Sequence, residues 1–102
     1  MSDFVDVAKV SDVLNGEGKV VEANGKKIAL FNISGEFYAI DNACKHRGGP
    51  LGEGYLMGDV VVCPWHAWEY NVKTGECPAA PQIKVDTYEV KVEDGRVKIK
   101  VE

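Results

Sequence analysis

The sequence lacks several features, and each absence excludes a class of protein. Its longest apolar runs, such as residues 28–31, are far too short to span a bilayer, and its first residues lack the basic and apolar stretches of a secretion signal. Lys and Arg number 12 against 16 Asp and Glu, and the resulting net charge of −4 argues against a nucleic-acid surface. We therefore expect a soluble, cytoplasmic protein with neither a membrane nor a nucleic acid as partner.

Cysteine and histidine are also scarce, yet nearly all of them stand together. The chain has three Cys and two His, and four of these five residues form two short pairs, Cys44-x-His46 and Cys63-x-x-His66. Sixteen residues separate the pairs. A [2Fe–2S] centre in which two Cys hold one iron and two His hold the other needs this set of ligands. With two of its three Cys assigned to iron, the chain is suited to a reducing compartment.

The residues around the two pairs favour tight loops. Gly48, Gly49 and Pro50 follow the first pair, and Pro64 lies inside the second. Glycine lets the backbone come close to an anion and turn its N–H groups towards it. A structural zinc site with two Cys and two His is an alternative, and the sixteen-residue spacer suits it too. The Cys-His order within each pair favours iron–sulfur, because zinc motifs more often keep the two Cys together.

The pattern Cys-x-His, sixteen residues, Cys-x-x-His resembles the Rieske iron–sulfur family. The resemblance runs from residue 41 through the Pro-Ala-Ala-Pro segment at 78–81, and the chain length is similar to that of the small Rieske ferredoxins. It implies one [2Fe–2S] cluster per chain, with Cys44 and Cys63 on the buried iron. It also implies His46 and His66 on the iron nearest solvent, and a third loop at 78–81 that closes over the cluster.

Departures from the family pattern indicate the subtype. Respiratory Rieske proteins join their two cluster loops by a disulfide, at the positions held here by Gly49 and Trp65, and place a Ser where this chain has Trp68. The chain can form no such bridge, and it has fewer donors to the cluster sulfurs. We therefore expect a reduction potential near the low end of the Rieske range, roughly −150 mV. Trp65 and Trp68 flank His66, where they would shield the cluster, form part of a docking face or pack on the sheet.

The resemblance implies a one-electron carrier and not an enzyme acting on its own. Electrons would come from an NAD(P)H-dependent flavoprotein reductase and pass to a terminal oxygenase, and no catalytic residue is predicted. Two alternatives stay open. One is the small Rieske subunit of a nitrite reductase or of another oxidoreductase complex. The other is a structural zinc-binding interaction module.

The remaining sequence predicts an all-β fold in a single domain, residues 1–102. Small antiparallel sheets would form a basal barrel or sandwich from residues 1–40 and 82–102, with a cluster-binding subdomain inserted at about 41–81. Strands from both ends of the chain must then pair. Three dipeptides predict hairpin turns between strands: Asn24-Gly25, Ser34-Gly35 and Asp94-Gly95.

Two local predictions are less regular. Tyr88, Val90 and Val92 alternate with polar residues, which predicts one strand with its apolar face inward and a break near Thr87. Residues 10–14 predict a single helical turn that begins at Ser11 or Asp12.

Overall fold

The structure is a computed structural model that describes residues 3–43, 49–65 and 68–101. These residues form antiparallel strands and two short 3₁₀ turns, which confirms the all-β prediction, and they include no helix long and apolar enough to cross a membrane. The turns are η1 (Val10–Asp12) and η2 (Leu51–Glu53). The strands are β1 (Asp3–Lys9), β2 (Gly18–Ala23), β3 (Lys26–Ile33), β4 (Glu36–Asp41), β5 (Tyr55–Met57), β6 (Val60–Val62), β7 (Glu69–Asn71), β8 (Glu76–Cys77), β9 (Ala80–Lys84), β10 (Thr87–Tyr88), β11 (Val90–Glu93) and β12 (Arg96–Val101).

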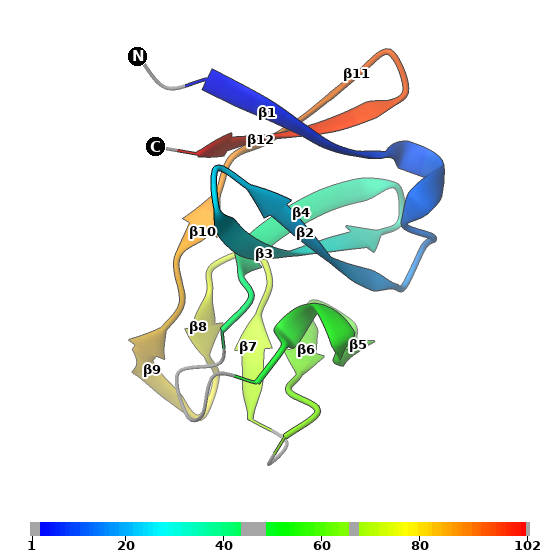
Figure 1. The fold of residues 1–102 in the computed structure, drawn as a ribbon. Coiled ribbons are helices and arrows are strands. Elements are labelled where there is room, and N and C mark those ends of the chain that lie inside the picture. Colours follow the sequence, from blue (N-terminus) through cyan, green and yellow to red (C-terminus); the bar gives the residue numbers. More distant parts are fainter. Residues whose placement is uncertain (1–2, 44–48, 66–67, 102) are drawn as a thin grey trace.

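The strands form four small sheets with the orders β1-β12-β11, β10-β4-β3-β2, β5-β6-β7 and β8-β9. Figure 1 shows the first sheet at one end of the molecule, the four-stranded sheet in the middle and β5 to β9 at the other end. The first and last strands pair with each other, as predicted, because β1 lies antiparallel to β12. The stretch from β5 to β9 is thus inserted between strands of the basal sheets.

The three predicted hairpin turns are present where the dipeptides place them. Asn24-Gly25, Ser34-Gly35 and Asp94-Gly95 each have positive φ at both residues, between 50° and 86°. Two successive residues of positive φ make the turn whose twist matches that of the paired strands, and Gly and Asn adopt this conformation at low cost. These turns fix the register of β2 on β3, β3 on β4 and β11 on β12.

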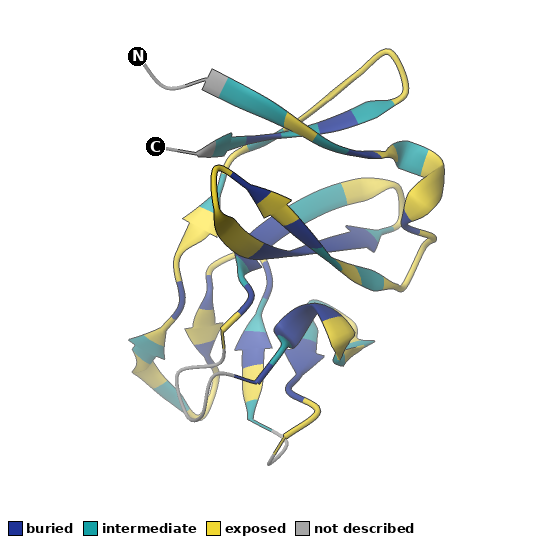
Figure 2. Ribbon diagram, viewed as in Figure 1, coloured by how far each residue is buried: buried dark blue, intermediate teal, exposed yellow. Residues whose placement is uncertain are grey.

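Strand β3 is buried on both faces, and its side chains contribute alternately to two separate cores (Figure 2). Ile28 and Leu30 pack in a core shared with the β1-β12 sheet, together with Val97 and Ile99. The alternate residues Ala29 and Phe31 face a second core. That second core consists of Ala29, Phe31, Ile40, Leu51, Val61, Cys63, Tyr70, Val72, Cys77 and Val85. The continuous apolar run at 28–31 is therefore a central strand between two layers.

The break predicted near Thr87 is confirmed, because β9 ends at Lys84 and β10 begins at Thr87. Two other local predictions are wrong. Tyr88 and Val90 belong to different sheets: Tyr88 pairs with Ala39 of β4, whereas Val90 pairs with Ile99 of β12. The strand breaks at Glu89, whose carbonyl accepts the N–H of Lys100 at 2.9 Å. Val92, on the edge strand β11, is 51% exposed, so the predicted inward-facing row of apolar side chains does not extend to it.

The helical turn also begins earlier than predicted. Turn η1 starts at Val10, and Asp12 is its last residue. The Asp12 carboxylate accepts the backbone N–H of Lys9 at 3.0 Å, so the acidic residue reaches back to the start of the turn. This contact lowers the pKa of Asp12, because the N–H stabilises the charged carboxylate.

Candidate metal centre

Of the four predicted ligands, Cys63 is described by the structure, whereas Cys44, His46 and His66 lie outside the described residues. Cys63 directly follows β6 and is 2% exposed. Its side chain belongs to the second core, beneath the four-stranded sheet. Within the described ranges, no group of three or more His, Cys, Asp or Glu could hold a metal ion. The described part of the predicted site thus consists of Cys63 and of the residues that flank the two predicted loops.

The first predicted loop is closed at its base. Ala43 and Pro50, one on each side of it, form an isolated antiparallel bridge. The N–H of Leu51 donates to the Asn42 carbonyl at 2.8 Å, and the N–H of Gly52 donates to Asn42 Oδ1 at 2.8 Å. Asn42 is only 7% exposed, and it was not singled out from the sequence. One buried amide side chain thus holds the two ends of this loop together.

The second predicted loop is closed in the same way. The N–H of Cys63 donates to the carbonyl of Trp68 at 2.7 Å, next to the paired ladder of β6 and β7. Trp68 itself is partly buried and packs against the second core, as one of the sequence interpretations expected. Cys63 and Trp68, which flank the second predicted loop, are therefore held next to each other at the end of the β6-β7 ladder.

The two loops meet at Gly49. A side-chain carbon placed on Gly49 would lie 2.7 Å from Cys63 Sγ and 3.2 Å from both Cγ and Cδ2 of Trp65. Real Cβ atoms essentially never come that close to a sulfur, so only glycine fits at this position. The Cys63 sulfur thus lies against the backbone of the first loop, as it must if one centre takes ligands from both loops. A buried sulfur donor at the junction of the two loops fits a thiolate-held iron–sulfur group.

The predicted third loop begins as a turn between β8 and β9. Pro78 and Ala79 form this turn, and Cys77 before it is 7% exposed in the second core. A mainly apolar cavity of about 380 Å³ lies beside the turn, lined by Trp68, Glu69, Cys77, Ala79, Ala80 and Ile83. Cys77 is a small buried side chain beside this turn, and the closing of this loop over a cluster stays a prediction.

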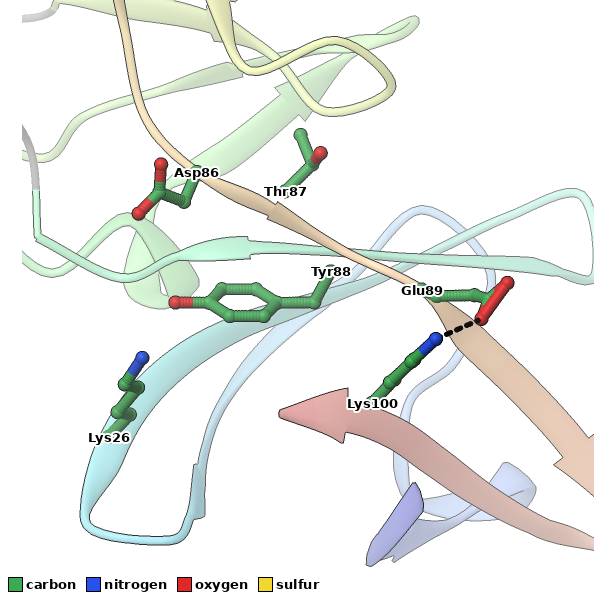
Figure 3. A pocket seen from close by; sticks show the side chains of 6 residues that line it. All are labelled: Lys26, Asp86, Thr87, Tyr88, Glu89 and Lys100. Carbon is green, nitrogen blue, oxygen red and sulfur yellow. Dashed lines mark ion pairs between the residues drawn. The ribbon is translucent and has the colours of Figure 1, made fainter. Parts of the chain in front are cut away.

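A polar groove lies beside β10, and Figure 3 shows the side chains that line it. It has a volume of about 490 Å³ and is lined by Lys26, Asp86, Thr87, Tyr88, Glu89 and Lys100. Lys100 and Glu89 form an ion pair at 4.0 Å, and burial raises the pKa of Tyr88 above its ordinary value. A neighbouring groove shares Lys26, Asp86 and Tyr88 and reaches Pro50 and Trp65. Among the described residues, neither groove is lined by Cys or His, and Cys63 lies outside both.

Comparison with known proteins agrees with this geometry. The family model "Rieske [2Fe-2S] domain" matches residues 3–89. The ferredoxin component of the naphthalene 1,2-dioxygenase/salicylate 5-hydroxylase systems of Ralstonia sp is 39% identical over 98% of this chain and 97% of its own length. The solved Sphingomonas yanoikuyae B1 ferredoxin has a TM-score of 0.88 and 33% identity, covering 98% of this chain and 100% of that one.

A third match is a ferredoxin seen together with its oxygenase. In the complex of reduced oxygenase and oxidized ferredoxin in carbazole 1,9a-dioxygenase, the matched chain is 32% identical with a TM-score of 0.85. The match covers 95% of this chain and 92% of that one. With nearly full coverage in every comparison, the chain belongs to the Rieske [2Fe–2S] domain family.

Proposed function

We propose that this protein is the ferredoxin component of a multicomponent oxygenase system. It takes single electrons from an NAD(P)H-dependent flavoprotein reductase and passes them to a terminal oxygenase, and it does not transform a substrate itself. The observation that carries this proposal is the full-length similarity to a protein named as the ferredoxin component of such systems. The junction of Cys63, Gly49 and Trp65 supports it from the structure, because it brings the two ligand loops together.

The residues proposed to hold the cluster are those of the two pairs. Cys44 and Cys63 would hold the buried iron, and His46 and His66 the outer one, with one [2Fe–2S] cluster per chain. The cluster supplies reversible one-electron transfer. The chain contributes the buried sulfur of Cys63, the loop bases closed by Asn42 and Trp68, and a core that keeps water from the inner side.

The division of the chain follows from this assignment. We propose that residues of about 41–81 form the cluster-binding subdomain, and that 1–40 and 82–102 form the basal part of one domain. The hydrogen bonds that close the two loop bases lie within the first of these ranges. A cytoplasmic location is proposed because the electron donor uses NAD(P)H and because two of the three Cys are assigned as thiolate ligands.

The alternatives are less well supported. Membership of the Rieske family argues against the zinc-module hypothesis, because the matched family is defined by an iron–sulfur cluster. A small subunit of a nitrite reductase would share the same cluster and fold. The 39% identity to an oxygenase-system ferredoxin favours the first function over this one.

The proposal is tested by EPR of the dithionite-reduced protein, with iron and zinc measured on the same sample. The expected result is a rhombic signal with the low average g of mixed His and Cys ligation and two irons per chain. Zinc without iron would overturn the proposal. A signal of the all-Cys type would mean that the assignment of the histidines is wrong, and because the chain has three Cys, it would require a thiolate from a second chain in addition to Cys77. Gel filtration with candidate partners then separates a diffusible carrier from a tightly held subunit.

A further inference from the structure

An aromatic ring and a sulfur converge on one glycine where the two loops meet. Gly49 comes from the first loop and is buried, whereas Cys63 and Trp65 belong to the second. Trp65 Cγ and Cδ2 lie 3.2 Å from the position a Gly49 Cβ would take, which is closer than nine in ten real contacts of this kind. The indole therefore packs on the Gly49 backbone, next to the Cys63 sulfur, and a larger residue at 49 would push both away.

The same ring also faces solvent. Trp65 is 50% exposed, although Cys63 two residues earlier is 2% exposed. Its other neighbours line a groove of about 600 Å³ that includes Ala43, Pro50 and Lys27. One part of the indole thus covers the loop junction, and the other part borders open solvent. Removing the ring would uncover the Gly49 backbone and the Cys63 sulfur behind it.

The contact between Trp65 and Gly49 matters because no disulfide can join the two loops at this point. Neither Gly49 nor Trp65 can form a disulfide between the loops, so apart from the proposed cluster ligands only non-covalent packing can hold the loops together at this point. A bulky aromatic side chain on a bare backbone gives a large contact area at low conformational cost. It also excludes water, and a drier environment strengthens the interactions of a nearby charged sulfur.

We propose that Trp65 is a positioning residue that latches the second loop onto the first through Gly49 and shields the Cys63 sulfur from water. The inference rests on the proposed function, because it takes Cys63 to be a cluster ligand. It adds a specific role for a residue outside the four ligands. The Trp65–Gly49 contact is called the loop latch below.

The test compares Trp65→Ala, Trp65→Phe and Tyr55→Ala as holoproteins. Tyr55 is the matched control because it is also an exposed aromatic, at 62%, but lies on β5 and not at the Gly49 junction. The first readout is the rate at which an iron chelator bleaches the visible absorbance of the cluster. The second is the deuterium coupling seen by pulsed EPR after reduction in D₂O, which reports water near the cluster.

We expect Trp65→Ala to lose its cluster about tenfold faster than the wild type, the change that corresponds to losing one well-packed ring contact. Its deuterium coupling should also rise. Trp65→Phe should restore most of the difference, and Tyr55→Ala should behave as the wild type. A simple loss of overall stability would raise the bleaching rate without changing the deuterium coupling, and this result would overturn the latch.

Gly49→Ala provides a second, independent variant. The added methyl would lie 2.7 Å from Cys63 Sγ, so the sulfur or the loop must move. We expect less iron per chain, or a shifted reduction potential in the protein that retains its cluster. An unchanged iron content, potential and bleaching rate would overturn the inference. Failure of the proposed function is distinguishable, since the wild type itself would then lack the Rieske EPR signal.

Discussion

At the scale of single residues, Asn42 closes the base of the first loop. Its Oδ1 accepts the Gly52 N–H and its backbone carbonyl accepts the Leu51 N–H, both at 2.8 Å. Replacing Asn42 by Ala leaves the Gly52 N–H buried without its partner, which costs about 1–3 kcal/mol. We expect the Asn42→Ala holoprotein to have a lower free energy of unfolding and to release its cluster faster, measured by denaturant titration and by bleaching with a chelator.

Asn15 offers the matched control for this prediction. Its Oδ1 accepts the Ser34 N–H at 2.7 Å, so the bond is of the same kind, but it lies at an exposed position. Water can replace the lost acceptor there, and Asn15→Ala should cost less and leave cluster release unchanged. If both variants released the cluster equally fast, Asn42 would have no special role at the loop base.

His66 carries the prediction that depends most directly on the ligand assignment. His66→Cys replaces a neutral ligand by a thiolate, whose negative charge disfavours the uptake of an electron. The reduction potential should move towards the values of all-Cys centres, about −400 mV in plant-type ferredoxins. Redox titration followed by EPR measures this shift. An unchanged or raised potential would count against His66 as an iron ligand.

Residue identity alone predicts part of the site and misses the rest. The ligand pairs can be read from the sequence because Cys and His are rare and stand two and three residues apart. The positions of Gly49 and Trp65 could be matched to a disulfide in related proteins, but not their packing on each other. Asn42 gave no signal, because an Asn before a loop is common and its burial depends on how distant strands fold over it.

At the scale of elements, one ion pair links the first and last strands. Arg96 of β12 donates from Nε to both carboxylate oxygens of Asp6 on β1, at 3.1 and 2.9 Å, and from a terminal nitrogen to Oδ1 at 2.9 Å. These bonds lower the pKa of Asp6 and raise that of Arg96. Both side chains are 41% exposed, so solvent screens the pair and we expect only a small contribution to stability.

The pH dependence of this pair has a definite sign. The pKa of Asp6 in the folded protein lies below its ordinary value of 3.8, so the pair stabilises the fold above that value and loses its effect as the pH falls through the lowered pKa. Asp6→Asn mimics the neutral acid. Its thermal midpoint should be lower than that of the wild type at pH 7, and the two midpoints should converge at a pH well below 3.8.

Circular dichroism melts of both proteins across this pH range measure the effect. Glu22→Gln is the control, because Glu22 is an exposed strand carboxylate that takes part in no ion pair among the described residues. A midpoint difference for Asp6→Asn that stays constant down to pH 2 would show that the charge of Asp6 is not what stabilises the strand pair.

Local sequence patterns predict hairpins well and changes of sheet poorly. Turns such as Asn24-Gly25 are decided by two adjacent residues whose positive φ is cheap, so no distant contact is needed to predict them. The alternation from Tyr88 to Val92 continues across the point where the chain leaves one sheet for another. Periodicity reports which side chains face inward and does not report which strand lies alongside.

At the scale of the whole molecule, the two cores on opposite faces of β3 have different neighbours. The core with Val97 lies between the four-stranded sheet and the sheet that joins the two chain ends. The core with Val61 contains Cys63 and Cys77 and lies towards the predicted cluster loops. In the sequence, the apolar run at 28–31 serves only to exclude a membrane span, and its two-sided packing depends on which sheet covers each face of β3, which the sequence does not show.

Because the two cores have different neighbours, we expect equivalent Val→Ala substitutions in them to change the rate of cluster release to different extents. Val61 and Val97 are both fully buried, so Val61→Ala and Val97→Ala should each lower the free energy of unfolding by a similar amount, about 2 kcal/mol. Only Val61→Ala should also speed cluster release, because Val61 lies in the same core as Cys63 and in the strand that directly precedes it. Denaturant titration measures the free energy of unfolding, and chelator bleaching under native conditions measures the rate of cluster release.

Equal acceleration of cluster release in both variants would mean that the release rate depends on global stability, so that the two faces of β3 form one cooperative unit. Acceleration in Val61→Ala alone would show that cluster retention depends on the core on one side of this strand.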